Sequence, residues 1–289
     1  RAFESPTAQA LLPNLVTAGE LPRSLSMAAG GRQVGVITGP ALGGLIYMAG
    51  PQAVYGTCAV CFLAACLLFA GIRPACSLHR REPATLASVF GGITYIRGNP
   101  VILGAISLDL FSVLLGGATA LLPIFARDIL HCGPWGLGVL RAAPAVGALA
   151  MSLALTRWPL QRRVGRTMFA SVALFGATVV VFGLSTSFFL SLAALLVQGA
   201  ADMVSVVIRA SLVQLETPDE MRGRVSAVNF IFIGASNQLG EFESGVTAAW
   251  FGAVPAVVLG GICTILVVLA WMRLFPELAR RQELAARPS

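Results

Sequence analysis

The chain has 289 residues, of which 56% are hydrophobic and only 11% are charged, and its mean hydropathy is +0.81. Soluble domains carry about 25% charged residues, so this composition excludes an ordinary soluble enzyme and indicates a surface that faces lipid. The net charge of +7 comes from 20 arginines without a single lysine. They lie mainly in short segments between apolar runs, which indicates membrane topology and excludes a nucleic-acid partner.

Long apolar stretches recur along the whole chain. A helix needs about 20 mostly apolar residues to cross a bilayer, and the sequence therefore predicts an all-α, polytopic membrane protein with about eight full transmembrane helices. These spans fall at 24–49, 53–72, 100–125, 136–157, 167–185, 188–213, 224–249 and 253–273. Residues 1–16 look like the end of one more helix. Junctions such as Gly50-Pro51 and Asn99-Pro100 separate the spans.

The arginines predict the orientation of these spans. Alternate loops, including the C-terminal tail, hold 15 of the 20 arginines, whereas the opposite loops hold only Arg127. Because arginine-rich loops stay on the cytoplasmic side, we expect a multi-pass protein of the plasma (inner) membrane with a cytoplasmic C-terminus.

The span 24–49 contains a glycine at every fourth position, Gly31, Gly35, Gly39 and Gly43. These glycines nearly stack on one helix face, which permits close approach of a second helix. Pro40 removes a backbone donor in mid-membrane and should bend or stiffen the helix there. Close helix packing is the simplest interpretation of this pattern.

The same run also carries a resemblance. Residues 35–44, Gly35-Val-Ile-Thr-Gly39-Pro40-Ala-Leu-Gly43-Gly44, match the GxxxGPxxGG core of the antiporter motif in the fifth helix of major facilitator superfamily exporters. Ser26 stands where the fuller motif has glycine. Three further stretches resemble the branch of enterobactin exporters and related secretion-type permeases; they lie at 122–128, 218–225 and 274–278.

The resemblance implies a division of the chain. Residues 1–72 would be the remainder of an N-terminal bundle, with the end of helix four and helices five and six, so helices one to three and part of four would be lacking. Residues 73–99 would be a cytoplasmic linker, 100–274 a six-helix bundle of helices seven to twelve, and 275–289 a cytoplasmic tail. Alternating access would rock the two bundles against each other, with the glycine face of 24–49 packed on Ala143, Gly147 and Ala148.

The linker contains an amphipathic stretch. Leu86, Val89, Phe90, Ile93 and Ile96 fall on one helical stripe. Such a helix either lies along the inner membrane surface or packs on the ends of neighbouring loops.

Ionisable residues occur inside the predicted spans, where insertion costs about 2.5–3.5 kcal/mol each. They are Arg32, Asp109, Arg141, Asp202, Arg209, Glu241 and Glu243, with Arg1 in the partial helix. Each calls for a partner or a wet cavity, so Arg32, Arg141, Glu243 and Arg209 are candidates for intramembrane pairs.

Helix geometry restricts the pairs. Asp202 and Arg209 share a face but lie about 10 Å apart along the axis. Arg141 can pair with Glu241 or Glu243, although both glutamates cannot face one cavity. Asp109 has no obvious local partner, and Arg209, close to the inner end, is expected to pair structurally or to snorkel.

Three carboxylates are candidates for proton or substrate coupling, Asp109, Asp202 and Glu241. The resemblance places Asp109 and Asp202 in helices that line the central cavity and Glu241 near the interface between bundles, and Arg1 resembles a helix-four arginine associated with proton coupling. We expect a monomeric exporter of a small molecule (a siderophore, drug or related metabolite) driven by protons, without a cofactor.

Two other classes compete with a transporter. A membrane enzyme would need paired aspartates, a Ser/His pair or a metal site, but His79 and His131 lie in loops on opposite sides and no span carries two aspartates. Cys58-Ala-Val-Cys61 lacks the second ligand pair of a zinc site, so no metal is expected. A transport-inactive fragment or scaffold is the other alternative.

Overall fold

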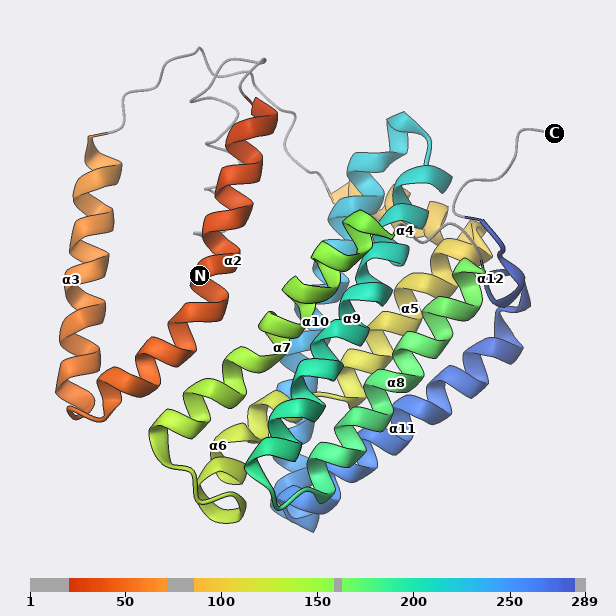
Figure 1. Ribbon diagram of the computed structural model, residues 1–289. Coiled ribbons are helices and arrows are strands. Elements are labelled where there is room, and N and C mark those ends of the chain that lie inside the picture. Colours follow the sequence, from red (N-terminus) through yellow and green to blue (C-terminus); the bar gives the residue numbers. More distant parts are fainter. Residues whose placement is uncertain (1–20, 72–85, 159–162, 284–289) are drawn as a thin grey trace. The chain divides into compact units, whose positions relative to one another are not determined.

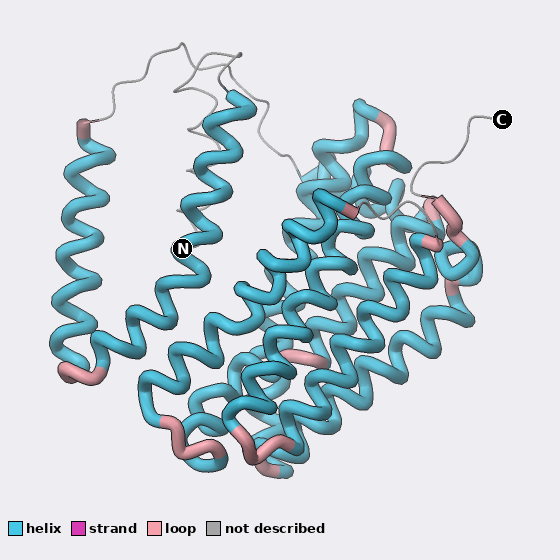
Figure 2. Tube along the Cα trace, in the orientation of Figure 1, coloured by secondary structure: helices cyan, strands magenta, loops and turns pink. Residues whose placement is uncertain are grey.

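The computed structural model describes residues 21–71, 86–158 and 163–283. It forms two compact units, divided between Pro83 and Ala84. Within these ranges every regular element is helical and no strand occurs, as Figure 2 shows. The predicted all-α class is therefore confirmed. The partial helix at 1–16, with Arg1, lies outside the described residues.

The described part of the first unit contains two helices, α2 (Leu21–Tyr47) and α3 (Pro51–Ala70). They correspond to the predicted spans 24–49 and 53–72. Pro40 lies inside α2 as expected. The turn between the helices uses Gly50 at a φ of 104°, a conformation that favours glycine, and α3 then starts at Pro51, whose missing N–H is not needed in a first helical turn.

The second unit is a bundle of long helices with short helical segments between and after them (Figure 1). Its long helices are α5 (Pro100–Leu115), α7 (Gly133–Arg157), α8 (Val164–Leu184), α9 (Phe188–Glu216), α10 (Asp219–Phe251) and α11 (Ala253–Leu274). Its short helices are α4 (Leu86–Gly98), η1 (Ala118–Leu121), α6 (Leu122–Ile124), the π-helical η2 (Phe125–Ile129) and α12 (Pro276–Arg280).

Six described stretches are long and apolar enough to cross a membrane: α3, the α5–η2 stretch, α7, α8, α9 and α11. Helix α10 is long enough but more polar, and the described apolar part of α2 is Val34–Tyr47. Polar residues explain the difference for α10, because this 33-residue helix carries Glu241, Glu243 and several amides. Helical structure is present at all eight predicted positions, six described stretches can cross a membrane, and the chain is a multi-pass membrane protein.

The predicted span 100–125 is wrong in one respect, because it is not one continuous helix. Asn99 caps the start of α5 by accepting from the N–H groups of Val101 and Ile102 at 3.1 and 3.2 Å. The helix ends at Leu115, and the chain passes through Gly116 and Gly117 before η1. A Cβ on Gly116 would lie 2.6 Å from the Phe175 ring, so a larger residue at the break would force this ring of α8 to shift.

Helix α9 packs against α7 at very short range. A Cβ on Gly147 of α7 would lie 1.9 Å from the Leu196 carbonyl oxygen, and one on Gly199 of α9 would lie 1.9 Å from the Pro144 carbonyl oxygen. Ala143 is also buried, at 3% exposure. The small-residue face of α7 is therefore covered by α9, and the expectation that Gly147 and Ala143 receive the glycine face of 24–49 is wrong.

Helix α4 packs on α10 within the second unit. Gly92 lies against the Arg224 backbone and the Val228 side chain, and Ile96 is 3% exposed in the same cluster. The Tyr95 hydroxyl donates to the Glu216 carbonyl at 2.7 Å. The predicted stripe is thus used for packing at its C-terminal end.

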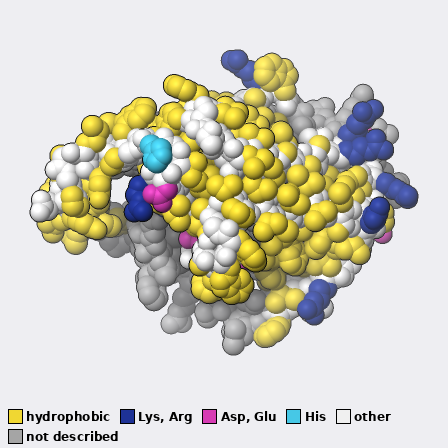
Figure 3. All heavy atoms as spheres, turned by 90° about the horizontal axis from the view of Figure 1, so that it is seen from below, with side chains coloured by type: hydrophobic (Ala, Val, Ile, Leu, Met, Phe, Trp, Pro, Cys, Tyr) yellow, Lys and Arg dark blue, Asp and Glu magenta, His cyan; other side chains and the backbone are white. Residues whose placement is uncertain are grey.

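The outside of the second unit is apolar. Phe189 and Trp250 are more than three-quarters exposed, and hydrophobic side chains cover most of the face drawn in Figure 3. In a membrane these side chains contact lipid.

Candidate functional site

Helix α9 carries a polar stripe through the apolar bundle. Gln198, Asp202, Ser205 and Arg209 follow one another at spacings of four, three and four residues, so they share one face of the helix. Gln198, Ser205 and Arg209 are each 5% exposed or less. Buried polar groups at this depth need partners, and the neighbouring helices α5 and α10 supply some of them.

Asp109 and Arg209 form a buried ion pair between α5 and α9. The Arg209 Nη2 atom lies 3.1 Å from Asp109 Oδ2, and the two side chains are 6% and 7% exposed. Arg209 Nη1 also donates to Asn229 Oδ1 of α10 at 3.2 Å. One guanidinium therefore joins three helices, while its Nε atom is buried without a partner. Arg209 does not snorkel towards an interface, and it pairs with Asp109, for which the sequence offered no local partner.

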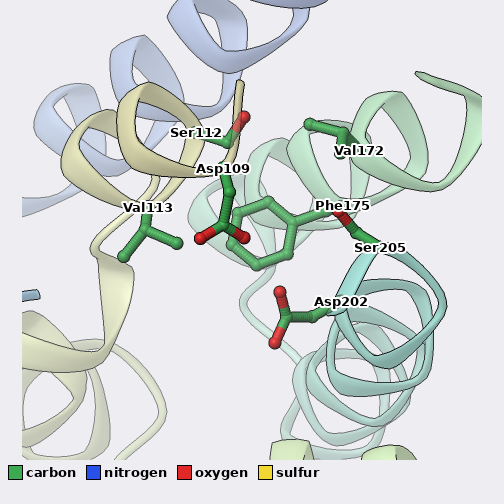
Figure 4. Close-up of a pocket in the computed structure, with 7 residues that line it drawn as sticks. All are labelled: Asp109, Ser112, Val113, Val172, Phe175, Asp202 and Ser205. Atoms are coloured by element: carbon green, nitrogen blue, oxygen red, sulfur yellow. The ribbon is translucent and has the colours of Figure 1, made fainter. Parts of the chain in front are cut away.

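Asp202 lies close to this pair. Asp109 and Asp202 both line a small cavity and point toward the same space beside the Phe175 ring of α8 (Figure 4). The other lining residues are Ser112, Val113, Val172 and Ser205. Two carboxylates and one guanidinium thus meet where α5, α8 and α9 converge. The Ser205 hydroxyl in the same cavity is buried without a hydrogen-bond partner.

A second, larger cavity of about 190 Å³ adjoins the first and shares Val113, Phe175 and Asp202 with it. Its remaining lining residues are Gly116, Gly117, Thr119, Pro144, Gln198, Gly199, Asn237 and Glu241. The break after α5 therefore forms part of its wall. Irregular backbone at membrane depth is tolerated where it lines a cavity, and this is the position of the break.

The remaining predicted charges lie apart from the ion pair. Glu241 lines the larger cavity, whereas Glu243 accepts a 2.8 Å hydrogen bond from the Thr247 hydroxyl on its own helix. Arg141 is exposed on α7, and the ion pairs formed by the described residues do not join it to either glutamate. Arg32 lies in α2 outside the described side chains, and Arg1 lies outside the described residues.

The antiporter-motif residues Gly35, Gly39, Pro40, Gly43 and Gly44 all lie on α2. Gly39 and Gly43 line a groove of about 370 Å³ against α3. Within the first unit a Cβ on either glycine would meet no described atom within 4 Å, so α3 does not provide the close packing that the pattern indicates. The role of this glycine face stays a prediction.

Several site residues were missed by the sequence analysis. Asn229, Gln198 and Asn237 are uncharged amides, and a search for ionisable groups passes over them. Their spacing gave a usable signal, because Asn229, Asn237 and Glu241 lie eight and four residues apart on α10. The Gly116-Gly117 pair inside an otherwise apolar run also indicated the break. Nothing in the sequence indicated that Phe175 would lie beside both aspartates.

Comparison with known proteins defines the class of this chain. The family described as the Major Facilitator Superfamily matches residues 1–240, and the chain belongs to this family.

Among curated proteins, the chain is similar to proteins named Enterobactin exporter EntS. The protein of Citrobacter koseri is 26% identical over 255 residues, which cover 86% of this chain and 60% of that protein. The proteins of Escherichia coli and Shigella boydii are each 25% identical over 260 residues, covering 85% of this chain and 60% of those proteins. The chain thus spans about 60% of the length of these relatives.

Proposed function

We propose that the protein is a secondary active transporter that exports a small molecule in exchange for protons. The observation that carries this proposal is the buried Asp109–Arg209 pair with Asp202 beside it. Membership of the family and the likeness to enterobactin exporters support a transporter that acts outward. A siderophore, a drug or a related metabolite is the proposed class of substrate.

The charges in the site support a proton-binding step. Arginine stays charged in proteins, so Arg209 balances only one of the two carboxylates. When Asp109 and Asp202 are both ionised, one negative charge is left in a largely water-excluded site, which is unfavourable. One bound proton removes that charge. A conformation that admits water from one side would release the proton there, and this supplies one proton exchanged in each cycle.

The same charges connect proton binding to helix movement. Arg209 contacts Asp109 on α5 and Asn229 on α10, so neutralising Asp109 would weaken its hold on α5. The break at Gly116 and Gly117 gives α5 a place to move, and the cavity next to it holds Asp202. Alternating access between the two halves of the fold is the proposed transport cycle, and the glycine face of α2 is proposed to pack between bundles.

We further propose that the protein lies in the plasma (inner) membrane as a monomer, with its C-terminus in the cytoplasm. The arginine distribution carries this orientation. A green fluorescent protein fused after Ser289 should fluoresce, whereas alkaline phosphatase at that position should be inactive. The reverse pattern would refute the orientation.

The transport proposal can be tested in proteoliposomes that contain the product of the whole open reading frame and the internal pH dye pyranine. Enterobactin and ethidium serve as two probes from different chemical classes. We expect at least one of these probes to change the internal pH of proteoliposomes that contain the protein without substitutions. Asp109→Asn and Asp202→Asn should abolish this pH change, while the variants still insert and elute as folded protein.

Two outcomes would refute parts of the proposal. If neither probe moves protons, proton-coupled export of these substrate classes is wrong. If both Asn variants transport normally, the assignment of the proton to Asp109 and Asp202 is wrong. Glu220→Gln, an exposed carboxylate at the start of α10, serves as the matched control and should behave like the original protein.

A further inference from the structure

The cavity of about 190 Å³ has a one-sided chemistry. It is lined by side chains of five helices and η1, and its described lining includes the carboxylates of Asp202 and Glu241 but no arginine, lysine or histidine. Arg209, the nearby cation of the smaller site, is paired with Asp109 and is not part of this lining. An anionic ligand would therefore meet Glu241, and also Asp202 whenever Asp202 has released its proton, with no cation in the described lining.

The backbone adds to this negative character. The last carbonyl groups of a helix have no partner within the helix, and its C-terminal end carries a partial negative charge. Helix α5, with 16 residues, ends at Leu115, and the two residues that follow, Gly116 and Gly117, line the cavity. Its negative end thus lies at the cavity wall.

The amides of the lining offer unused acceptors. Gln198 is 5% exposed and lines the cavity, and its Oε1 atom has no hydrogen-bond partner. Asn237 donates its Nδ2 hydrogen to the Ile233 carbonyl at 2.9 Å, so its Oδ1 atom is available as an acceptor. An unpaired buried acceptor is unfavourable, and a ligand that brings N–H donors would satisfy it.

The size and the apolar part of the wall indicate what kind of cation fits. The volume is several times the share of one water molecule in the liquid, about 30 Å³, so a bare metal ion would not fill it. Phe175, Val113 and Pro144 supply an apolar wall, and an aromatic ring attracts a cation placed over its face.

We infer that this cavity binds the ammonium group of an organic cation, with Asp202 and Glu241 as its counter-charges. This inference rests on the proposed transport function and names the substrate class that its site prefers. Because Asp202 also belongs to the proposed proton site, a bound cation and a bound proton compete for one carboxylate. Exchange of one for the other then follows from this competition.

The test is equilibrium binding to purified protein in detergent at pH 7, where no gradient exists. Phenethylammonium and 3-phenylpropionate are probes of the same size and opposite charge, and calorimetry measures both. We expect phenethylammonium to bind at least about tenfold more tightly than 3-phenylpropionate. Asp202→Asn should weaken its binding by about tenfold or more, and Glu241→Gln should weaken it less because Glu241 is exposed.

Glu220→Gln is the matched control, since this exposed carboxylate lies near the opposite end of α10 from Glu241. The affinity of this variant for phenethylammonium should equal that of the original protein. A cooperative thermal unfolding transition shows that each variant is folded. If Asp202→Asn does not fold, Gln198→Leu and Glu241→Gln replace it as the variants expected to bind phenethylammonium more weakly. The inference is overturned if phenethylammonium does not bind at millimolar concentration, if both probes bind equally, or if a folded Asp202→Asn variant binds normally. The inference would also be overturned if the original protein bound Na⁺ saturably but did not bind phenethylammonium, and if Asp202→Asn abolished the Na⁺ binding.

Failure here is distinguishable from failure of the transport proposal. Ammonium binding without any proton-coupled transport would refute the transport proposal and leave this inference standing. Proton-coupled transport of enterobactin, without tighter binding of phenethylammonium than of 3-phenylpropionate, would support the transport proposal and refute this inference.

Discussion

Helix α9 takes part in two unlike contacts, and the difference between them shows how this bundle holds charge inside a membrane. Against α7 it places Gly199 and the Leu196 backbone so close that only glycine fits on either side. Against α5 and α10 it places a polar stripe beside two cavities. The first, dense contact brings backbone against backbone, whereas the second, polar contact is joined by an ion pair and a side-chain hydrogen bond.

The two contacts use different forces. Lipid is as apolar as a leucine side chain, so helices in a bilayer gain little from the hydrophobic effect and associate by close packing and interhelical hydrogen bonds. The α7–α9 contact relies on dispersion between backbones. The α5–α9–α10 contact relies on Arg209 and its partners. The dense contact can hold α9 in place while the polar contact changes its protonation state.

The largest expected effect comes from breaking the charge balance of the polar contact. Arg209→Gln leaves Asp109 buried without its counter-charge, and loss of one partner of a buried pair costs about 3–5 kcal/mol. The double variant Asp109→Asn, Arg209→Gln keeps similar shapes without charge and should recover most of that loss. Thermal unfolding in detergent measures both. A double variant as unstable as the single one would show that the pair is not an isolated charge couple.

The next effect tests the dense contact. Gly199→Ala places a Cβ 1.9 Å from the Pro144 carbonyl oxygen, and because the obstacle is backbone, the helices must move apart. Overpacking of this kind costs about 1–3 kcal/mol. Gly245→Ala on α10 is the matched control, since its Cβ meets no described atom within 4 Å, and it should be neutral or slightly stabilising. Equal stability of the two variants would mean that α7 and α9 are not held by close packing.

The same contrast explains how much of the molecule the sequence could predict. Helix starts follow from local patterns, so the predicted starts at 53, 100 and 253 lie within a few residues of the starts of α3, α5 and α11. The partner of Gly147 depends on which helix lies opposite, and a small-residue pattern does not contain that information. Gly147 of α7 has its partner in the backbone of Leu196 on α9.

The polar site was predictable in its parts but not in its pairing. Asp109, Asp202 and Arg209 were each indicated as costly charges in a membrane. Their meeting depends on how α5 and α9 cross, which no single-helix argument supplies. The separation of about 10 Å along α9 argued against a direct Asp202–Arg209 pair, and in the structure Arg209 pairs with Asp109. Predicting the cavity beside them would have required the relative positions of five helices at once.

The smallest expected effect asks whether a polar contact outside the site matters to the bundle. Trp271 of α11 donates from Nε1 to the Ser107 hydroxyl of α5 at 2.9 Å, and its ring lies 5.1 Å from that of Phe111. Trp271→Phe removes the hydrogen bond and keeps an aromatic ring, and interhelical hydrogen bonds in membranes contribute about 0.6 kcal/mol on average. We expect a fall in thermal stability near the limit of detection, and none in Trp250→Phe, whose ring is 77% exposed. A loss of about 2 kcal/mol or more in the free energy of unfolding of Trp271→Phe would be well above that average. Polar contacts would then stabilise the α5–α11 side as strongly as they stabilise the site. The contrast between the polar contacts of α9 and the rest of the bundle would no longer hold.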